Sequence, residues 1–194
     1  MIKQAEILEI FQKTGALLGG HFLLSSGLHS GQYFQCARVL QFPELAEQLC
    51  SKIGEHFSDQ NVQAVAAPAI GGILVAHETA RFLKVRALFS ERENGNMVLR
   101  RGLEIESGEN VLVVEDVVTT GGSVREVIEL VRRSRGKPVG VGCIVDRSGG
   151  KVNFGIEFFS LIKLDIAASA PDKCDLCKQG LPLVKPGSRK LNNG

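Results

Sequence analysis

Apolar and polar residues form two alternating patterns along most of the chain. Short apolar runs typical of buried strands are each followed by a stretch in which apolar residues recur every three or four positions, as on one face of a helix. Turn residues such as Gly71-Gly72 separate the two kinds of block. We predict strands at 62–67, 87–90, 110–114, 139–145 and 158–164, and helices from 43 to 57, from the Gly-Gly turn to 83, and from 123 to 135.

This alternation predicts an α/β fold with a mainly parallel sheet flanked by helices, because right-handed crossovers join such units. The run 110–114 is apolar at every position after its first, as expected for a strand buried on both faces. An amphipathic helix at 2–14 and two short strands at 21–24 and 33–38 precede the alternating part.

The charge and composition of the chain exclude several classes of protein. Its 23 basic and 21 acidic residues give a formal net charge of +2, without the basic excess expected of a nucleic-acid-binding protein. No apolar run approaches membrane-spanning length, and the first residues lack the pattern of a signal peptide. Five cysteines, an odd and mostly scattered set, argue against a disulfide framework and for a reducing, cytoplasmic location.

The most informative segment is 111–123, where an apolar strand runs into Glu115-Asp116 and then into a Thr-Thr-Gly-Gly-Ser loop at the start of a helix. Ligands of open parallel sheets bind beyond the carboxyl ends of the strands. Small loop residues let backbone amides approach an oxyanion, and a helix N-terminus favours negative charge. Carboxylates accept hydrogen bonds from the vicinal diol of a ribose and also bind Mg²⁺. The segment therefore predicts a ribose 5-phosphate site with Mg²⁺ nearby, the alternative being an acidic strand end followed by an ordinary turn.

The same segment resembles the phosphoribosyl pyrophosphate (PRPP) motif of the type I phosphoribosyltransferases. The resemblance implies a small N-terminal hood element over the active site. The chain length and the lack of a linker predict a single domain at 1–184, and the residues 185–194, rich in Pro, Gly, Ser, Lys and Asn, predict a loose tail. The resemblance also implies that the loop after the strand 62–67 contacts pyrophosphate through its amides, although a tight strand-to-helix turn has the same sequence. The residues implied in PRPP binding are Ala69, Ile70, Gly71, Glu115, Asp116, Val117, Val118, Thr119, Thr120, Gly121, Gly122 and Ser123, with Glu115 and Asp116 catalytic and Asp116 a ligand for Mg²⁺.

Two further stretches resemble orotate phosphoribosyltransferases. The stretch 22–34 resembles their N-terminal segment, so residues 1–42 are expected to contribute to base binding; the alternative is a hairpin with core aromatics. Arg147 follows an apolar strand and is expected to be exposed, and a guanidinium matches the carboxylate that distinguishes orotate from uracil. The alternative for Arg147 is an exposed salt bridge with Asp146 or another acid. The residues implied in orotate binding are Ser25, Tyr33, Phe34, Thr119 and Arg147.

The chain departs from the pattern of the resembled family at two places. Many members have a lysine where Ser25 stands, and many have a hood loop with a Lys-x-His-Gly element. The corresponding region here, 91–102, has arginines at 92, 100 and 101 but no lysine or histidine. We expect Arg92 to neutralise pyrophosphate charge during catalysis; alternatively, the three arginines belong to a solvated hairpin.

The resemblance implies an enzyme that transfers ribose 5-phosphate from PRPP to orotate with Mg²⁺ as cofactor, and that acts as a homodimer. No nucleic acid or membrane is expected as a partner. Two alternatives keep the segment 111–123: a purine phosphoribosyltransferase, and a regulator that senses PRPP without turnover. The purine enzyme needs no carboxylate partner at Arg147, and the regulator requires a basic face or a DNA-binding element.

A Cys-x-x-Cys pair near the C-terminus, Cys174 and Cys177, has metal-ligand spacing. A structural zinc site needs four ligands, and no second pair lies nearby in the sequence. Two copies of the pair across a dimer axis would complete such a site. A redox role would require the pair at a helix start beside a strand, as in thioredoxin-like folds.

Overall fold

The structure is a computed structural model that describes residues 4–24, 27–164 and 168–185 of the 194-residue chain. Ser25, which the sequence placed in the orotate site, lies outside the described residues, as does the predicted tail except for Lys185.

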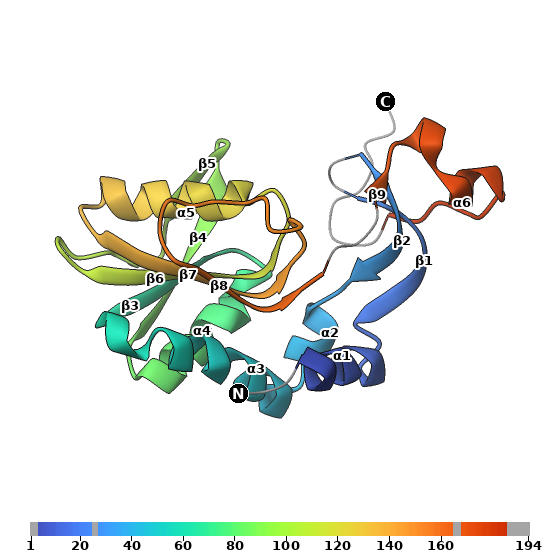
Figure 1. The fold of residues 1–194 in the computed structure, drawn as a ribbon. Helices are drawn as coiled ribbons and strands as arrows, with labels where there is room; N and C mark the ends of the chain where they lie inside the picture. The colour runs from blue at the N-terminus through green and yellow to red at the C-terminus, as the bar shows by residue number, and fades with distance from the viewer. Residues whose placement is uncertain (1–3, 25–26, 165–167, 186–194) are drawn as a thin grey trace.

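A mixed, mostly parallel sheet forms the main body, as predicted (Figure 1). Its strand order within the described residues is β5-β4-β3-β6-β7-β8, and β4–β5 is the antiparallel pair. Helices α3 and α4 cover one face, and α5 covers the other (Figure 1). The strands are β3 (Ala64–Pro68), β4 (Arg86–Glu93), β5 (Asn96–Leu99), β6 (Asn110–Val118), β7 (Lys137–Asp146) and β8 (Phe158–Lys163), and the helices are α3 (Pro43–His56), α4 (Gly72–Leu83) and α5 (Gly122–Arg133).

Burial on both faces explains why the central strand β6 is apolar at successive positions. Leu112 and Val114 belong to the apolar cluster under α3 and α4, whereas Val111 and Val113 belong to the cluster under α5. Successive side chains of a strand point to opposite faces, so a sheet covered on both sides needs apolar residues at every position. Strands β3, β6 and β7 are parallel neighbours, so their carboxyl ends lie at the same edge of the sheet.

A small sheet of order β1-β2-β9 projects from the main body (Figure 1). The hairpin of β1 (Leu17–Leu23) and β2 (His29–Phe34) pairs with the C-terminal strand β9 (Ala168–Ser169), and Val184 bridges to Phe22. We call residues 17–34 and 168–185 the hood; it also contains a 3-10 turn, η2 (Pro171–Lys173), and α6 (Asp175–Lys178). The hood was expected to be N-terminal, but the structure builds it from both ends of the chain.

Three further elements lie outside the two sheets: one helix before the hood hairpin, one helix after it, and a short turn after α3. Helix α1 (Gln4–Lys13) buries Ile7 and Phe11 in the main core, which confirms the predicted amphipathic helix. Helix α2 (Ala37–Leu40) leads from the hairpin into α3, and a 3-10 turn, η1 (Ser58–Gln60), follows α3.

Two local predictions were wrong. The strand predicted at 33–38 ends at Phe34, and α2 follows, because Cys36, Val39 and Leu40 are buried together at helical spacing. The polar region 91–102 was expected to be a loop of the hood but is largely the β4–β5 hairpin at the edge of the main sheet. Its turn residues Asn94 and Gly95 have positive φ angles of 49° and 84°, which a two-residue hairpin turn of type I′ requires.

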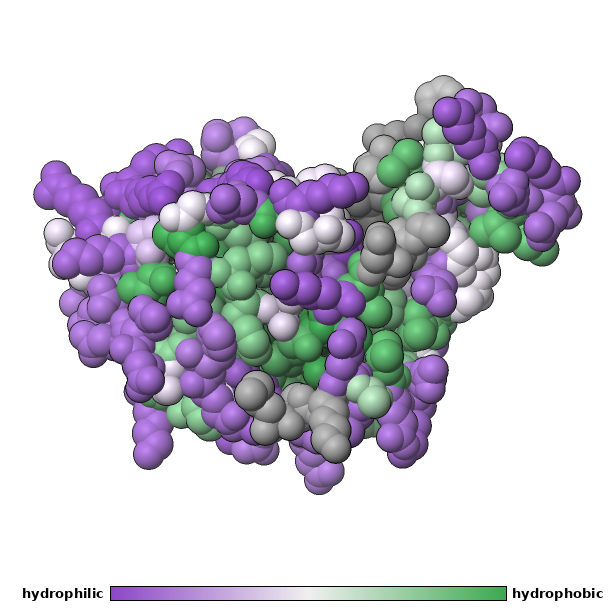
Figure 2. Space-filling model, viewed as in Figure 1, coloured by the Kyte–Doolittle hydropathy of each residue, from purple (hydrophilic) through white to green (hydrophobic). Residues whose placement is uncertain are grey.

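None of the helices in the described part of the chain is long and apolar enough to cross a lipid bilayer. Figure 2 shows polar residues around the rim of the main body and apolar residues gathered in the middle of the same face, toward the hood.

Candidate active site at the carboxyl edge of the sheet

The acid pair lies at the carboxyl end of β6, and its two members have different environments. Glu115 is buried, with 9% of its surface exposed, whereas Asp116 is partly exposed. Glu115 Oε1 accepts a hydrogen bond from the Asp116 amide at 3.1 Å, and Asp116 Oδ1 accepts one from the Val117 amide at 2.8 Å. Burial, followed by the neighbouring charge of Asp116, raises the pKa of Glu115 well above its ordinary value.

The loop between β3 and α4 packs directly against both carboxylates. A Cβ atom added to Gly71 would lie 2.7 Å from Asp116 Oδ2, and one added to Gly72 would lie 3.1 Å from Glu115 Oε1. Glycine therefore allows the loop backbone to approach the acid pair closely. Within this loop Ala69-Ile70 is a cis peptide bond, and the Ile70 side chain is 80% exposed. The structure thus brings together two segments that the sequence singled out separately.

A small hollow lies where β6 turns into α5. It is lined by Glu115 and by every residue from Val117 to Val124. Gly121 turns the chain with a φ of 74°, and a Cβ atom there would lie 2.9 Å from the Phe154 ring. Because the first amides of a helix have no intrahelical acceptor, the amides at the start of α5 can bind an anion in this hollow.

Arg147 follows β7, next to the end of β6, and its amide donates to the Val118 carbonyl at 2.8 Å. The expectation of an exposed side chain was wrong: Arg147 is partly buried, and burial lowers the pKa of its guanidinium. Its Nε atom is buried without a hydrogen-bond partner, and within the described residues Arg147 forms no ion pair. The alternative of a salt bridge with Asp146 is also wrong, since Asp146 is 1% exposed and accepts from the Ser148 amide.

Tyr33 and Phe34 have opposite surroundings, as successive residues of β2. Burial raises the pKa of Tyr33, and the charges of Arg147 and Asp116 act on it in opposite directions. Tyr33 therefore lies near both the arginine and the acid pair. Phe34 is 4% exposed and packs edge-on against Phe11 in the main core, with ring centroids 5.5 Å apart. Its position thus matches the alternative of a core aromatic rather than a base contact.

The three arginines of the region 91–102 are all engaged with acids. Arg92 pairs with Glu126 of α5 at 2.7 Å, Arg100 with Glu93 at 3.4 Å, and Arg101 with Glu91 at 2.9 Å. This arrangement matches the alternative of a solvated hairpin. In this structure the contacts of Arg92 are with α5 and the hairpin turn, and none is with the acid pair.

Two histidines that the sequence analysis did not single out lie beside the cysteine pair. His21 and His29 of the hood hairpin meet Cys174 and Cys177 in the folded chain. The two pairs are separated by more than a hundred positions, so spacing alone gave no signal. Their positions on either side of the predicted hairpin turn, His21 near the end of β1 and His29 at the start of β2, are the signal that could have drawn attention to them.

Glu115→Gln is expected to raise the melting temperature of the ligand-free protein most at alkaline pH. The raised pKa means that folded Glu115 holds its proton more tightly than unfolded Glu115. Its contribution to stability is therefore complete below the unfolded pKa of about 4.3 and is lost as the pH rises through the folded value. Glutamine is neutral throughout, so the difference in melting temperature between variant and wild type should grow in thermal melts as the pH rises above about 4.3. A gap independent of pH would contradict a neutral buried carboxyl group.

Known proteins resemble this chain in both sequence and fold. Residues 37–168 match the family model described as phosphoribosyl transferase domain. The orotate phosphoribosyltransferase of Desulforamulus reducens is 56% identical over 190 residues, which cover 98% of this chain and 100% of the relative. A crystal structure of orotate phosphoribosyltransferase from Aeropyrum pernix matches with a TM-score of 0.70 and 27% identity, covering 90% of this chain and 98% of that one.

The fold alone is less specific. A crystal structure of adenine phosphoribosyltransferase from Thermoanaerobacter pseudethanolicus matches with a TM-score of 0.60 at 18% identity, covering 69% of this chain and 88% of that one. Proteins named for different bases therefore share the fold, whereas the high sequence identity is to proteins named for orotate.

Proposed function

The chain belongs to the phosphoribosyl transferase family and, within it, to the orotate phosphoribosyltransferases, and from this premise we propose that it transfers ribose 5-phosphate from PRPP to orotate. The products are orotidine 5′-phosphate and pyrophosphate, in de novo pyrimidine biosynthesis. One observation carries the proposal: the acid pair, the amide-lined hollow and a partly buried arginine with an unpartnered Nε meet at one edge of the sheet.

The 5-phosphate of PRPP would occupy the hollow beyond Thr119, where the amides of Gly121, Gly122 and Ser123 at the start of α5 would bind it. The ribose diol would then reach Glu115 and Asp116. Hydroxyl donors stabilise a carboxylate, so diol binding would lower the raised pKa of Glu115 toward its ordinary value. The Gly71 loop would contact the pyrophosphate through backbone amides, since it packs directly against the acid pair.

The acid pair also suits Mg²⁺. Asp116 offers a partly exposed carboxylate, a hard oxygen ligand, and its neighbour Glu115 carries a pKa raised partly by mutual repulsion. Asp116 would hold the ion, directly or through water, together with oxygens of PRPP. When bound, Mg²⁺ neutralises the charge of the departing pyrophosphate.

Orotate would bind between Arg147 and the hood. The guanidinium fork of Arg147 matches the carboxylate of orotate, which would occupy the unpartnered Nε and offset the burial of the arginine. Tyr33 would line the same site, because it lies near both Arg147 and Asp116. Thr119, an exposed residue at the end of β6, would contact the base from the side of the phosphate loop.

The reaction forms a bond between a ring nitrogen of orotate and the anomeric carbon, which inverts its configuration. The bond from that carbon to pyrophosphate breaks, pyrophosphate leaves with the electron pair, and the proton of the attacking ring nitrogen passes to the departing pyrophosphate or to water. The transition state carries positive charge on the ribose, as in glycoside chemistry. The carboxylates of Glu115 and Asp116 stabilise this charge and orient the sugar, so catalysis comes from positioning and electrostatics. Arg92 would contribute to pyrophosphate binding only after leaving Glu126.

A turnover assay tests the function. The protein, PRPP, Mg²⁺ and orotate are mixed, and the loss of orotate absorbance is followed; adenine, guanine and hypoxanthine are supplied in parallel reactions. We expect turnover in the reaction that contains orotate and no turnover in the reactions that contain adenine, guanine or hypoxanthine. Turnover with a purine instead would overturn the assignment of the base, and PRPP binding without turnover of any base would favour the regulator.

We also place the enzyme in the cytoplasm as a homodimer. The five cysteines, all of them in the described part of the chain, form no disulfide, which suits a reducing compartment. Ile70 and Leu74 at the start of α4 are large apolar side chains with 80% and 47% exposure, as expected of a surface that a second copy covers. Sedimentation equilibrium is expected to give the mass of a dimer, and a monomer mass across the concentration range would contradict this.

A further inference from the structure

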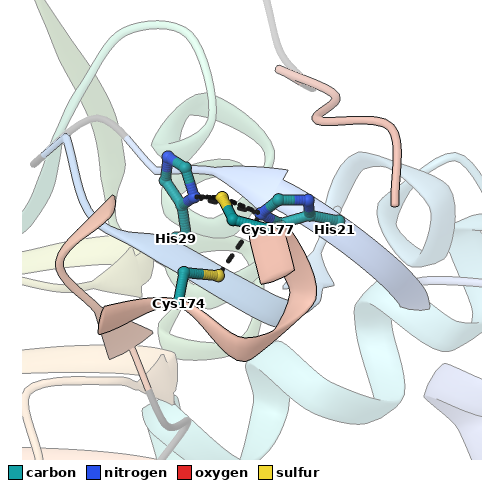
Figure 3. Close-up of side chains that lie close together, drawn as sticks. All are labelled: His21, His29, Cys174 and Cys177. Carbon is teal, nitrogen blue, oxygen red and sulfur yellow. Dashed lines mark hydrogen bonds between the residues drawn. The ribbon is translucent and has the colours of Figure 1, made fainter. Parts of the chain in front are cut away.

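Four side chains with metal-binding atoms converge in the hood (Figure 3). His21 and His29 come from the two strands of the hairpin, and Cys174 and Cys177 come from the C-terminal segment. One ligand atom from each residue lies within 4.8 Å of all the others. His21, His29 and Cys174 are buried, whereas Cys177 is exposed.

The separations of these atoms match the edges of a tetrahedron around a metal ion. His21 Nε2 lies 3.0 Å from His29 Nδ1, 3.5 Å from Cys174 Sγ and 3.6 Å from Cys177 Sγ, and His29 Nδ1 lies 3.2 Å from Cys177 Sγ. With zinc–nitrogen bonds of about 2.0–2.1 Å and zinc–sulfur bonds of about 2.3 Å, tetrahedral ligand atoms are about 3.3–3.8 Å apart. Small adjustments of the side chains would therefore complete the coordination.

The hydrogen bond on the far side of the His21 ring makes Nε2 a ligand atom. His21 Nδ1 lies 2.8 Å from the Leu181 carbonyl oxygen, which can only accept, so Nδ1 carries the proton. In the neutral ring Nε2 then presents a lone pair to His29 Nδ1 and to both sulfur atoms. A histidine bound to a metal commonly donates its other ring N–H to a carbonyl in this way. A cation at the centre would satisfy all these lone pairs at once.

The cysteine pair is also arranged as a metal ligand. The spacing of two residues between the cysteines is the one common in structural zinc sites.

The hood has little apolar core of its own. Apart from Leu17 and Phe34, no described residue of the hood belongs to either apolar cluster of the main body. Leu181, Leu183 and Val184 of its C-terminal segment are 44%, 44% and 51% exposed. Small units that bury so little apolar surface are often stabilised by a metal ion.

We propose that His21, His29, Cys174 and Cys177 bind one zinc ion, which fastens the C-terminal segment of the hood to the β1–β2 hairpin. Two imidazole nitrogens and two thiolates fill the four tetrahedral positions of Zn²⁺, so the site has a structural role and no open position for a substrate. The four ligands come from a single chain, in contrast to the site across a dimer axis considered from the sequence. The proposal does not depend on the activity of the enzyme.

Metal analysis of the protein purified without chelator tests the site. We expect close to one zinc per chain, and Cys177→Ser and His29→Ala each to lose it. Cys50→Ala and His77→Ala are matched controls, because Cys50 is buried in α3 and His77 is exposed on α4, and neither belongs to the cluster. Both controls should keep the zinc. Retention of zinc by the two cluster variants would overturn the proposal.

Cobalt substitution keeps the test valid if a cluster variant does not fold. Wild-type protein is stripped of metal under reducing conditions and titrated with Co²⁺. We expect absorption bands of tetrahedral cobalt with thiolate ligands, saturating at about one equivalent per chain. Wild-type protein that contains no zinc as purified and binds neither Co²⁺ nor Zn²⁺ after reduction would overturn the site, as would a stable Cys174–Cys177 disulfide in protein kept under reducing conditions.

Discussion

Asp116→Asn is expected to lower kcat about 100- to 1000-fold in a protein that stays folded, the range found when one electrostatic contact to a transition state is removed. Asparagine has the shape of aspartate, so it fits against Gly71, where a Cβ atom would already lie 2.7 Å from the carboxylate. It can also still accept the hydrogen bond from the Val117 amide. What it lacks is the negative charge that would stabilise the cationic ribose and hold Mg²⁺. Steady-state kinetics at saturating PRPP and orotate measure the effect.

Asp59→Asn is the matched control for this variant, because Asp59 is an exposed carboxylate in η1 and makes no contact with the site. Its kcat should equal that of the wild type. Thermal melts of both variants show whether the fold is kept. A kcat for Asp116→Asn close to that of the control would remove the acid pair from the mechanism.

Arg147→Ala is expected to raise the KM for orotate about 10- to 100-fold, because a hydrogen bond to a charged group contributes about 1.5–3 kcal/mol. The KM for PRPP should change much less, since the phosphate hollow is built from other residues. Arg147→Lys should give an intermediate KM, because lysine keeps the charge but loses the planar fork. The KM for each substrate is measured at saturating concentrations of the other.

Arg132→Ala controls for the loss of a surface arginine, since Arg132 pairs with Glu129 on the exposed side of α5. Neither KM should change in this variant. If Arg147→Ala raised the KM for PRPP as much as that for orotate, the arginine would not be the partner of the orotate carboxylate.

The main body was predictable because its elements are long and strongly periodic. Strand β6 is buried on both faces and therefore reads as a continuous apolar run, and α5 carries its apolar residues on one stripe. The same parallel order explains why sequence reasoning placed Glu115, Asp116 and the loop 119–123 at one edge of the sheet. The contact of Gly71 and Gly72 with the carboxylates depends on the pairing of β3 with β6, which no local pattern specifies.

The parts that were missed depend on contacts between distant segments. Residues 36–40 are too few for their periodicity to distinguish a helix from a strand, so the predicted strand extended into the first two residues of α2. Phe34 and Tyr33 are adjacent aromatics, and the sequence does not show which of them faces the core. His21 and His29 meet Cys174 and Cys177 only because β9 pairs with β2, although the two segments lie at opposite ends of the chain.

A crystal structure of the protein with bound ribose 5-phosphate tests the proposed site most directly. We expect the phosphate to lie in the hollow between Val117 and Val124, bound by amides at the start of α5, and the two sugar hydroxyls to donate to Glu115 and Asp116. A sugar phosphate bound elsewhere on the chain, with this hollow empty, would contradict the proposed site and the mechanism built on it.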